Sequence, residues 1–188
     1  YLRIAPELYL KRLIVGGFPK VYEMNRNFRN EGISYKHNPE FTMLELYEAY
    51  GDMNSMMKLC EELIVHLTQI VHGSLEIEFE GGKIDMSPPW KRIKYLDVVE
   101  SIGGVKIDEN MKLEDVKAAA AKKGISKDLL EKCDSIWRVA EVVFDEKVEA
   151  KLTQPVFITH FPLELSPLAK AWPENPNYVE RFEPYVAG

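Results

Sequence analysis

The chain has 188 residues, of which 46% are hydrophobic and 29% are charged, and its formal net charge is -6. This length and hydrophobic content are sufficient for a buried core, and the acidic balance argues against a protein that grips nucleic acid through a broad basic surface. The two cysteines, Cys60 and Cys133, have no CxxC partner, so the sequence indicates neither a disulfide framework nor a zinc site and favours a reducing, cytoplasmic location. No apolar run reaches the ~18 residues of a membrane span, and the first residues do not resemble a signal peptide.

The first predicted elements are a short helix and a strand–loop–strand unit. Apolar residues at helical spacing predict a helix over 6–15, followed by a glycine pair, Gly16 and Gly17, that would end it. Alternating polar and apolar residues predict strands over 20–31 and 41–50. The connection between the strands contains Gly, Ser, Asn and Pro and is too long for a tight turn.

A long amphipathic helix follows, from Asp52 to Gly73. Its period of 3.6 places five residues on one apolar stripe: Met56, Cys60, Leu63, Leu67 and Ile70. Next, two short runs on either side of Gly81 and Gly82 predict a hairpin over 75–86.

The second half of the chain is predicted to be mainly helical before it returns to strands. Three stretches rich in Ala, Lys and Glu predict helices over 95–102, 113–123 and 127–151. We expect these stretches to form a helical insertion. Strands are predicted over 156–159 and 182–186, separated by a loop with several prolines.

The strand pair predicts one polar face that could hold a ligand. Successive side chains of a strand point to opposite faces. The first strand has an apolar set, Tyr22, Met24 and Phe28 with Arg26 as an exception, and a polar set, Glu23, Asn25, Asn27, Arg29 and Glu31. The second strand separates Leu44, Leu46 and Tyr50 from Phe41, Met43, Glu45 and Tyr47.

If the apolar sets face the core, the other two sets converge on one surface with a guanidinium, carboxylates and aromatic rings. Such a surface suits a ligand that is part phosphate, part flat base and part cation. Arginine can donate two parallel hydrogen bonds to a phosphate, an aromatic ring can stack on a purine, and carboxylates can hold an ammonium group. A solvated outer face of an antiparallel pair would show the same pattern, so parity alone leaves both readings open.

The residues themselves resemble a known family. The runs FRNEG at 28–32 and HNPEFTMLELY at 37–47 resemble the second conserved motif of class II aminoacyl-tRNA synthetases in its lysyl form, and 3–10 and 166–170 are similar to the same family. The likeness is weakest across about 97–151. The resemblance implies an α+β fold, with an antiparallel sheet flanked by helices, in which residues 1–188 form a partial catalytic domain with a helical insertion at about 97–151.

The resemblance also implies roles for individual residues. Arg29 would contact the α-phosphate of ATP and serve as the catalytic residue, and the other ATP-binding residues would be Glu31, His37 and Phe41, with the Phe41 ring stacked on adenine. The lysine pocket would be lined by Glu7, Glu45 and Tyr47. In this chemistry the lysine carboxylate attacks the α-phosphate and pyrophosphate leaves, so catalysis is positioning and charge stabilisation without a protein nucleophile.

Several parts of the family pattern are absent from these residues. The first and third motifs and the carboxylates that hold Mg²⁺ are not found, both ends look cut, and we therefore expect a fragment that is inactive alone and contains no metal ligands. For the full-length enzyme the resemblance implies lysine, ATP and tRNA(Lys) as substrates, Mg²⁺ as cofactor, a cytoplasmic homodimer and no membrane.

Two other functions remain open. A paralogous ligase that attaches lysine to elongation factor P shares the HNPEFTM core, although the continuation through Tyr50 into Gly51 and Asp52 favours the tRNA enzyme. A non-catalytic module derived from a synthetase would retain the fold but lose pocket residues, and Arg29 and Phe41 are both present here.

Overall fold

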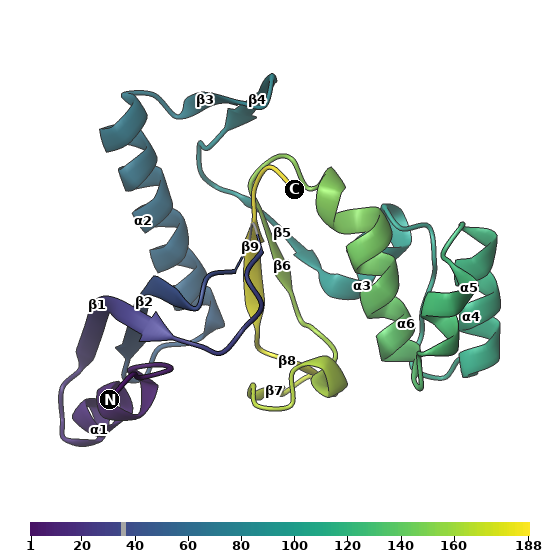
Figure 1. Ribbon diagram of the computed structural model, residues 1–188, viewed down its shortest axis with the longest axis horizontal. Helices are drawn as coiled ribbons and strands as arrows, with labels where there is room; N and C mark the ends of the chain where they lie inside the picture. The colour runs from purple at the N-terminus through teal and green to yellow at the C-terminus, as the bar shows by residue number, and fades with distance from the viewer. Residues whose placement is uncertain (35–36) are drawn as a thin grey trace. The chain divides into compact units, whose positions relative to one another are not determined.

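A computed structural model describes residues 1–34 and 37–188, and the chain divides into two compact units, Tyr1–Asp52 and Met53–Gly188 (Figure 1). Each unit combines helices with small sheets, so the predicted α+β class is confirmed. Within the described ranges no helix is long and apolar enough to cross a membrane.

The first unit is a helix packed on a two-stranded antiparallel sheet. Helix α1 (Glu7–Val15) ends at Gly16, and the next residue, Gly17, has a positive φ of 100° that an L side chain rarely adopts. Strands β1 (Lys20–Phe28) and β2 (Glu40–Glu48) pair along their full length, from Lys20 opposite Glu48 to Phe28 opposite Glu40. The predicted helix and strand pair are confirmed, although β1 ends three residues earlier than the sequence pattern indicated.

The expectation that the apolar set of β1 faces the core is wrong. Tyr22 is 75% exposed and Met24 is 67% exposed, whereas Asn27 on the opposite face is completely buried. The reason is that α1 packs against both strands and the Arg3 side chain reaches onto the polar face, where Nη1 donates to Glu23 Oε1 (2.6 Å). The alternation of side chains along the strand correctly assigned the residues to two faces. It could not show which of the two faces is covered by the rest of the unit.

The second unit begins with helix α2 (Met53–His72) and a hairpin of β3 (Glu76–Phe79) and β4 (Gly82–Asp85). The predicted apolar stripe of this helix is wrong in detail, because Leu67 and Ile70 are 48% and 65% exposed. The helix instead buries Met57, Glu61 and Thr68, a neighbouring face of the same cylinder. Apolar residues lie on more than one side of this helix, so its sequence alone does not determine which face is buried.

Strand β5 (Lys91–Lys94) is parallel to β6 (Val156–Thr159), which is antiparallel to β9 (Phe182–Tyr185), and together they form the sheet of the second unit. A two-residue strand β7 (Ala171–Trp172) pairs with β8 (Asn175–Val179) beside it. Strands β6 and β9 agree with the sequence prediction. Strands β5, β7 and β8 were not predicted, because β7 has only two residues and the other two are short and contain several polar residues.

Helices α3 (Tyr95–Ser101), α4 (Leu113–Lys122), α5 (Lys127–Glu131) and α6 (Ile136–Val143) lie together at one end of the second unit (Figure 1). The prediction of one helix over 127–151 is wrong. The chain breaks after α5, and Ser135 caps α6 by accepting a hydrogen bond from Arg138 N (3.2 Å). Helix α6 then continues as a π-helical turn (Phe144–Val148) and a 3-10 turn (Glu149–Lys151).

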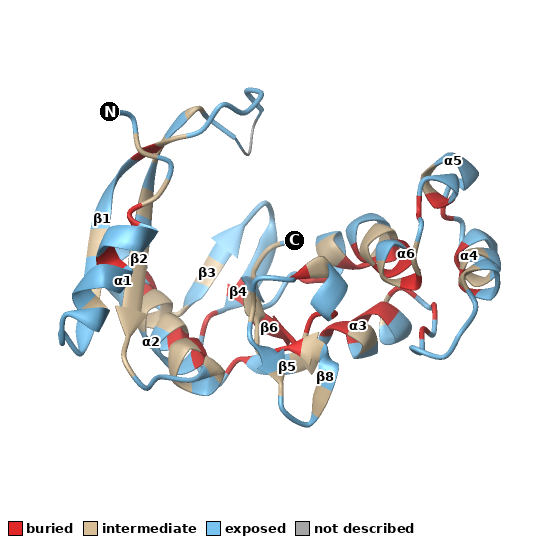
Figure 2. Ribbon diagram, turned by 90° about the horizontal axis from the view of Figure 1, so that it is seen from below, coloured by how far each residue is buried: buried red, intermediate tan, exposed pale blue. Residues whose placement is uncertain are grey.

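The main core of the second unit lies between this helical group and the sheet, where the buried residues gather in Figure 2. Val98 of α3, Val143 of α6 and Ile158 of β6 are all completely buried there. The helices of 97–151 thus share a core with the strands on either side of them. Their separate status as an insertion stays a prediction.

Candidate functional site

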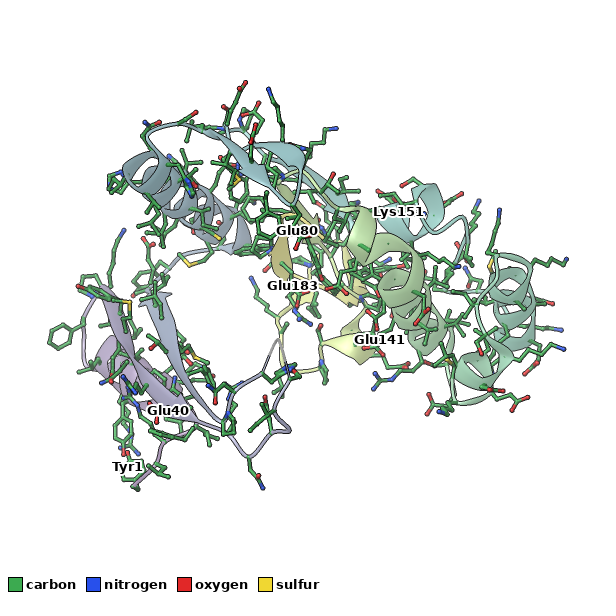
Figure 3. All side chains as sticks on the ribbon, turned by 45° about the horizontal axis from the view of Figure 1, so that its top comes forward. Tyr1, Glu40, Glu80, Glu141, Lys151 and Glu183 are labelled. Atoms are coloured by element: carbon green, nitrogen blue, oxygen red, sulfur yellow. The ribbon has the colours of Figure 1, made fainter. Side chains whose placement is uncertain are left out.

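The candidate site is the polar face of the first unit, which we define as the side of the β1–β2 pair that carries Glu23, Asn27, Phe41, Glu45 and Tyr47. The antiparallel register places Asn27 opposite Phe41 and Glu23 opposite Glu45. Because facing residues of an antiparallel pair point to the same side, these residues of the two strands share one face, whereas Glu31, predicted for the same surface, lies beyond the end of β1. The opposite face carries Arg26, which pairs with Glu40 (labelled in Figure 3).

Arg29 and Phe41 meet at one end of the polar face. The Arg29 guanidinium carbon lies 5.3 Å from the centre of the Phe41 ring, within the range of a cation–π contact. The backbone holds the arginine at the end of β1, since Arg29 N donates to Pro39 O (3.0 Å). Its Nε donates to the carbonyl oxygen of Ile4 (3.3 Å). An exposed guanidinium beside an aromatic ring is thereby available at the edge of the sheet.

Glu45 and Tyr47 meet at the other end. The Tyr47 hydroxyl donates to Glu45 Oε2 (2.9 Å), and Lys11 of α1 lies 5.9 Å from the centre of the Tyr47 ring. Burial, this hydrogen bond, and the charges of Glu45 and Glu7 together raise the pKa of Tyr47 above its usual value. The phenol therefore stays protonated and orients the Glu45 carboxylate. Glu7 forms an ion pair with Lys11 on α1 and faces the same corner.

The two remaining predicted residues, Glu31 and His37, lie on the loop between β1 and β2. Both are exposed. His37 contacts Ser34, with Nδ1 and Oγ 3.0 Å apart, and its backbone N donates to the same hydroxyl (3.1 Å). The structure therefore brings together Arg29 with Phe41, and Glu45 with Tyr47. Of the two loop residues, Glu31 contacts the first pair through its backbone N, which donates to Arg29 O (3.0 Å), whereas His37 has no described contact to either pair.

Sequence reasoning did not single out three residues that complete the polar face: Arg3, Glu23 and Asn27. Arg3 Nη1 donates to Glu23 Oε1 at 2.6 Å, and both side chains are partly buried. Strand alternation places Glu23 and Asn27 on this face, so the sequence pattern could have identified these two residues. For Arg3 no local pattern exists, because it reaches the strand from a separate segment of the chain.

The matches to known proteins extend over the whole chain. The family model for class II tRNA synthetases (D, K and N) matches residues 1–188. The chain belongs to this family.

Its relatives among curated proteins include lysine–tRNA ligases of three bacteria. The Pelotomaculum thermopropionicum protein is 51% identical over the whole chain, which covers 37% of that relative. The Carboxydothermus hydrogenoformans protein is 52% identical with 38% covered, and the Nostoc punctiforme protein is 48% identical with 33% covered. The chain thus spans little more than a third of the length of these relatives.

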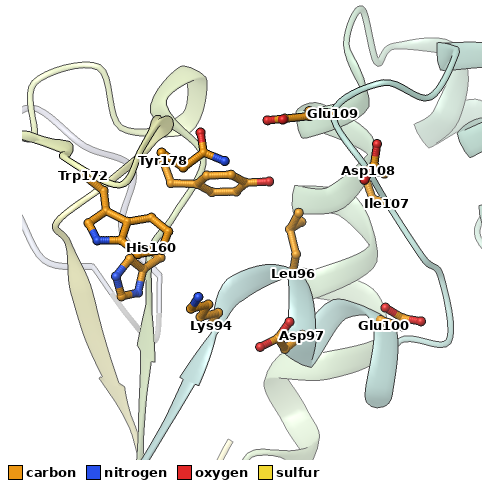
Figure 4. A pocket seen from close by; sticks show the side chains of 11 residues that line it. Lys94, Leu96, Asp97, Glu100, Ile107, Asp108, Glu109, His160, Trp172 and Tyr178 are labelled. Carbon is orange, nitrogen blue, oxygen red and sulfur yellow. The ribbon is translucent and has the colours of Figure 1, made fainter.

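The second unit of this synthetase chain contains a separate pocket of about 320 Å³ at the ends of β5 and β6 (Figure 4). Lys94 lies 4.7 Å from the centre of the Trp172 ring, and His160 meets the same ring edge-on at 4.4 Å. Burial and then the Lys94 charge lower the pKa of His160. The opposite wall is acidic, with Asp97, Glu100, Asp108 and Glu109.

Proposed function

We propose that this chain supplies part of the active site of a lysine–tRNA ligase, which activates lysine with ATP and transfers it to tRNA(Lys). The observation that carries the proposal is the polar face, where an arginine–phenylalanine pair and a glutamate–tyrosine pair lie on one side of the same two strands. Membership of the family and about 50% identity to proteins named lysine–tRNA ligase support the same conclusion.

At the arginine end the ligand would be ATP. The exposed Arg29 guanidinium is suited to an α-phosphate, because it can donate two parallel hydrogen bonds to phosphate oxygens. The Phe41 ring beside it offers a flat face to adenine. Glu31 and His37, on the loop that joins the strands, would hold the remainder of the nucleotide.

At the tyrosine end the ligand would be lysine. The Glu45 carboxylate, oriented by the Tyr47 hydroxyl, would accept hydrogen bonds from an ammonium group. Glu7 lies on α1 and interacts electrostatically with Tyr47, so it would supply the second carboxylate for the two amino groups of the substrate. The Lys11 ammonium already lies beside the Tyr47 ring, which shows that an ammonium group fits next to this phenol.

The chemistry needs no nucleophile from the chain. An oxygen of the lysine carboxylate forms a bond to the α-phosphorus while the bond to pyrophosphate breaks, and Arg29 would stabilise the negative charge on the α-phosphate. Mg²⁺ would neutralise the pyrophosphate. Within residues 1–34 and 37–188 there is no group of three or more His, Cys, Asp or Glu that could hold a metal ion, and no step is assigned to it.

We extend the proposal to the full-length protein as a cytoplasmic homodimer. Both cysteines of the chain are free thiols, which supports a reducing compartment. The dimer rests on the family resemblance alone.

The experiment is a replacement of the matching 188 residues in the Pelotomaculum thermopropionicum relative by this chain. The chimeric protein is incubated with ATP, labelled lysine, total tRNA and cell protein, and the acid-precipitable label is treated with ribonuclease. We expect ribonuclease-sensitive label. Substitution Arg29→Gln should reduce the rate by about 100-fold or more, as for other lost transition-state donors. Arg26→Gln, a matched change on the opposite face, should leave the rate nearly unchanged.

Each other outcome supports a different function. Ribonuclease-resistant label on protein would favour the ligase that modifies elongation factor P. Complete absence of label from a folded chimera, with the unmodified relative active, would favour the non-catalytic module and overturn the proposal.

A further inference from the structure

The polar face holds three buried side-chain atoms without a hydrogen-bond partner among the described residues: Nη2 of Arg3 and both Nδ2 and Oδ1 of Asn27. Asn27 is completely buried. A buried polar group without a partner is destabilising, because it loses its hydrogen bonds to water and gains none in the protein, so such groups are rare in native proteins. Here both ends of one amide are unpaired, which requires a physical explanation.

The position of Asn27 relates it to the ligand end of the face. It lies directly opposite Phe41, and two residues later Arg29 places its guanidinium over the same Phe41 ring. Residues 3–4 run alongside this part of β1, because Phe28 N donates to Arg3 O (2.8 Å) and Arg3 Nε donates to Arg26 O (3.3 Å). This segment therefore borders β1 next to Asn27, whose side chain is completely buried.

Arg29 is bonded to the same segment in the free chain. Its Nε donates to Ile4 O, and its guanidinium rests on the Phe41 ring. Both contacts use groups that the proposed function assigns to the nucleotide, namely the guanidinium for a phosphate and the ring for adenine. When Arg29 turns to a phosphate, the Ile4 carbonyl loses its donor, and the segment beside Asn27 is left with an unpaired acceptor.

We propose that Asn27 is a positioning residue for Arg29. Its amide is unpaired while Arg29 is bonded to Ile4, and it forms a hydrogen bond to the backbone of residues 3–6 when Arg29 moves to the nucleotide. When the nucleotide binds, the Asn27 amide thus replaces Arg29 as the hydrogen-bond partner of this backbone segment. The bound state then contains fewer unpaired polar groups, which favours nucleotide binding. This inference rests on the proposed function, since it takes the phosphate partner of Arg29 from there.

The alternative is that Asn27 is a packing residue whose unpaired amide serves no purpose. The two readings differ in what happens when the amide is replaced. Removing a group that is unpaired in the free state and paired in the bound state stabilises the free chain and weakens nucleotide binding. Removing a packing residue changes stability without a selective effect on one substrate.

The test uses Asn27→Val and Asn27→Thr, two variants of nearly equal shape that differ by a hydroxyl able to donate and accept. Thermal unfolding is measured on the 188-residue chain, and KM for ATP and for lysine is measured in the chimeric ligase. The valine variant should unfold at the same temperature as the parent or higher, with KM for ATP raised about 3- to 10-fold and KM for lysine within twofold. The threonine variant should unfold at a lower temperature than the valine variant, with KM for ATP closer to the parent.

Equal KM values for ATP in the two variants, or a valine variant less stable than the threonine variant, would overturn the inference while the parent chimera remains active. An inactive parent chimera is a different result, because it overturns the proposed function and this inference together.

Discussion

Replacement of Tyr47 by phenylalanine removes one hydrogen bond from the proposed lysine end of the polar face. The hydroxyl donates to Glu45 Oε2 at 2.9 Å in a half-buried position. Hydrogen bonds to charged groups contribute about 1.5–3 kcal/mol, and partial exposure places this one at or below the lower end of that range, at ~1–1.5 kcal/mol. At about 1.4 kcal/mol for each tenfold change, we expect KM for lysine to rise roughly 5- to 10-fold.

The assay is steady-state aminoacylation by the chimeric ligase with each substrate varied in turn. KM for ATP should remain within twofold, because Arg29 and Phe41 lie at the other end of the face. Tyr22→Phe is the matched control, since Tyr22 is on the same strand pair, faces the opposite side and is 75% exposed. An equal rise in both KM values, or no change for Tyr47→Phe relative to the control, would refute the assigned role of Tyr47.

Two further predictions concern the second unit. Glu61 is buried and accepts a hydrogen bond from Trp90 N (2.8 Å), so Glu61→Ala should lower the free energy of unfolding, measured in urea, by ~1–3 kcal/mol. The control Glu62→Ala, on the exposed side of the helix, should change it by less than ~0.5 kcal/mol. Similar losses in the two variants would contradict the importance of the buried hydrogen bond. Burial and then Lys94 lower the pKa of His160, so protons bind the unfolded chain more readily and stability is lost as pH falls below the ordinary histidine value near 6.5. In an NMR titration, Lys94→Met should move the His160 midpoint upwards, and an unchanged midpoint would show that the lysine charge has no influence.

Elements with strong local signals were predicted well from the sequence. Helix α1 and strand β6 have nearly the predicted bounds, because a glycine stop and a compact apolar run are local features. The pairing of β1 with β2 and the grouping of Glu45 with Tyr47 also followed from strand alternation alone. The family resemblance added the chemical interpretation of these residues.

The errors came from features that depend on distant parts of the chain. Tyr22 and Met24 are exposed because α1 and the Arg3 side chain pack on the other face, which strand periodicity cannot show. The helix predicted over 127–151 is interrupted where Ser135 begins a new helix, although the lysine- and glutamate-rich residues around it favour helix. The buried, unpaired amide of Asn27 was likewise invisible in the sequence, since it depends on the segment at Arg3.

The central claim is that the polar face selects lysine, and the most direct measurement is amino-acid-dependent exchange of pyrophosphate into ATP by the chimeric ligase. The family that matches this chain covers D, K and N synthetases, so lysine, aspartate and asparagine are the informative substrates. With Glu7, Glu45 and Tyr47 supplied by this chain, we expect exchange with lysine and none above background with the other two. Exchange supported by aspartate or asparagine, or loss of lysine-dependent exchange in a folded chimera, would contradict the account.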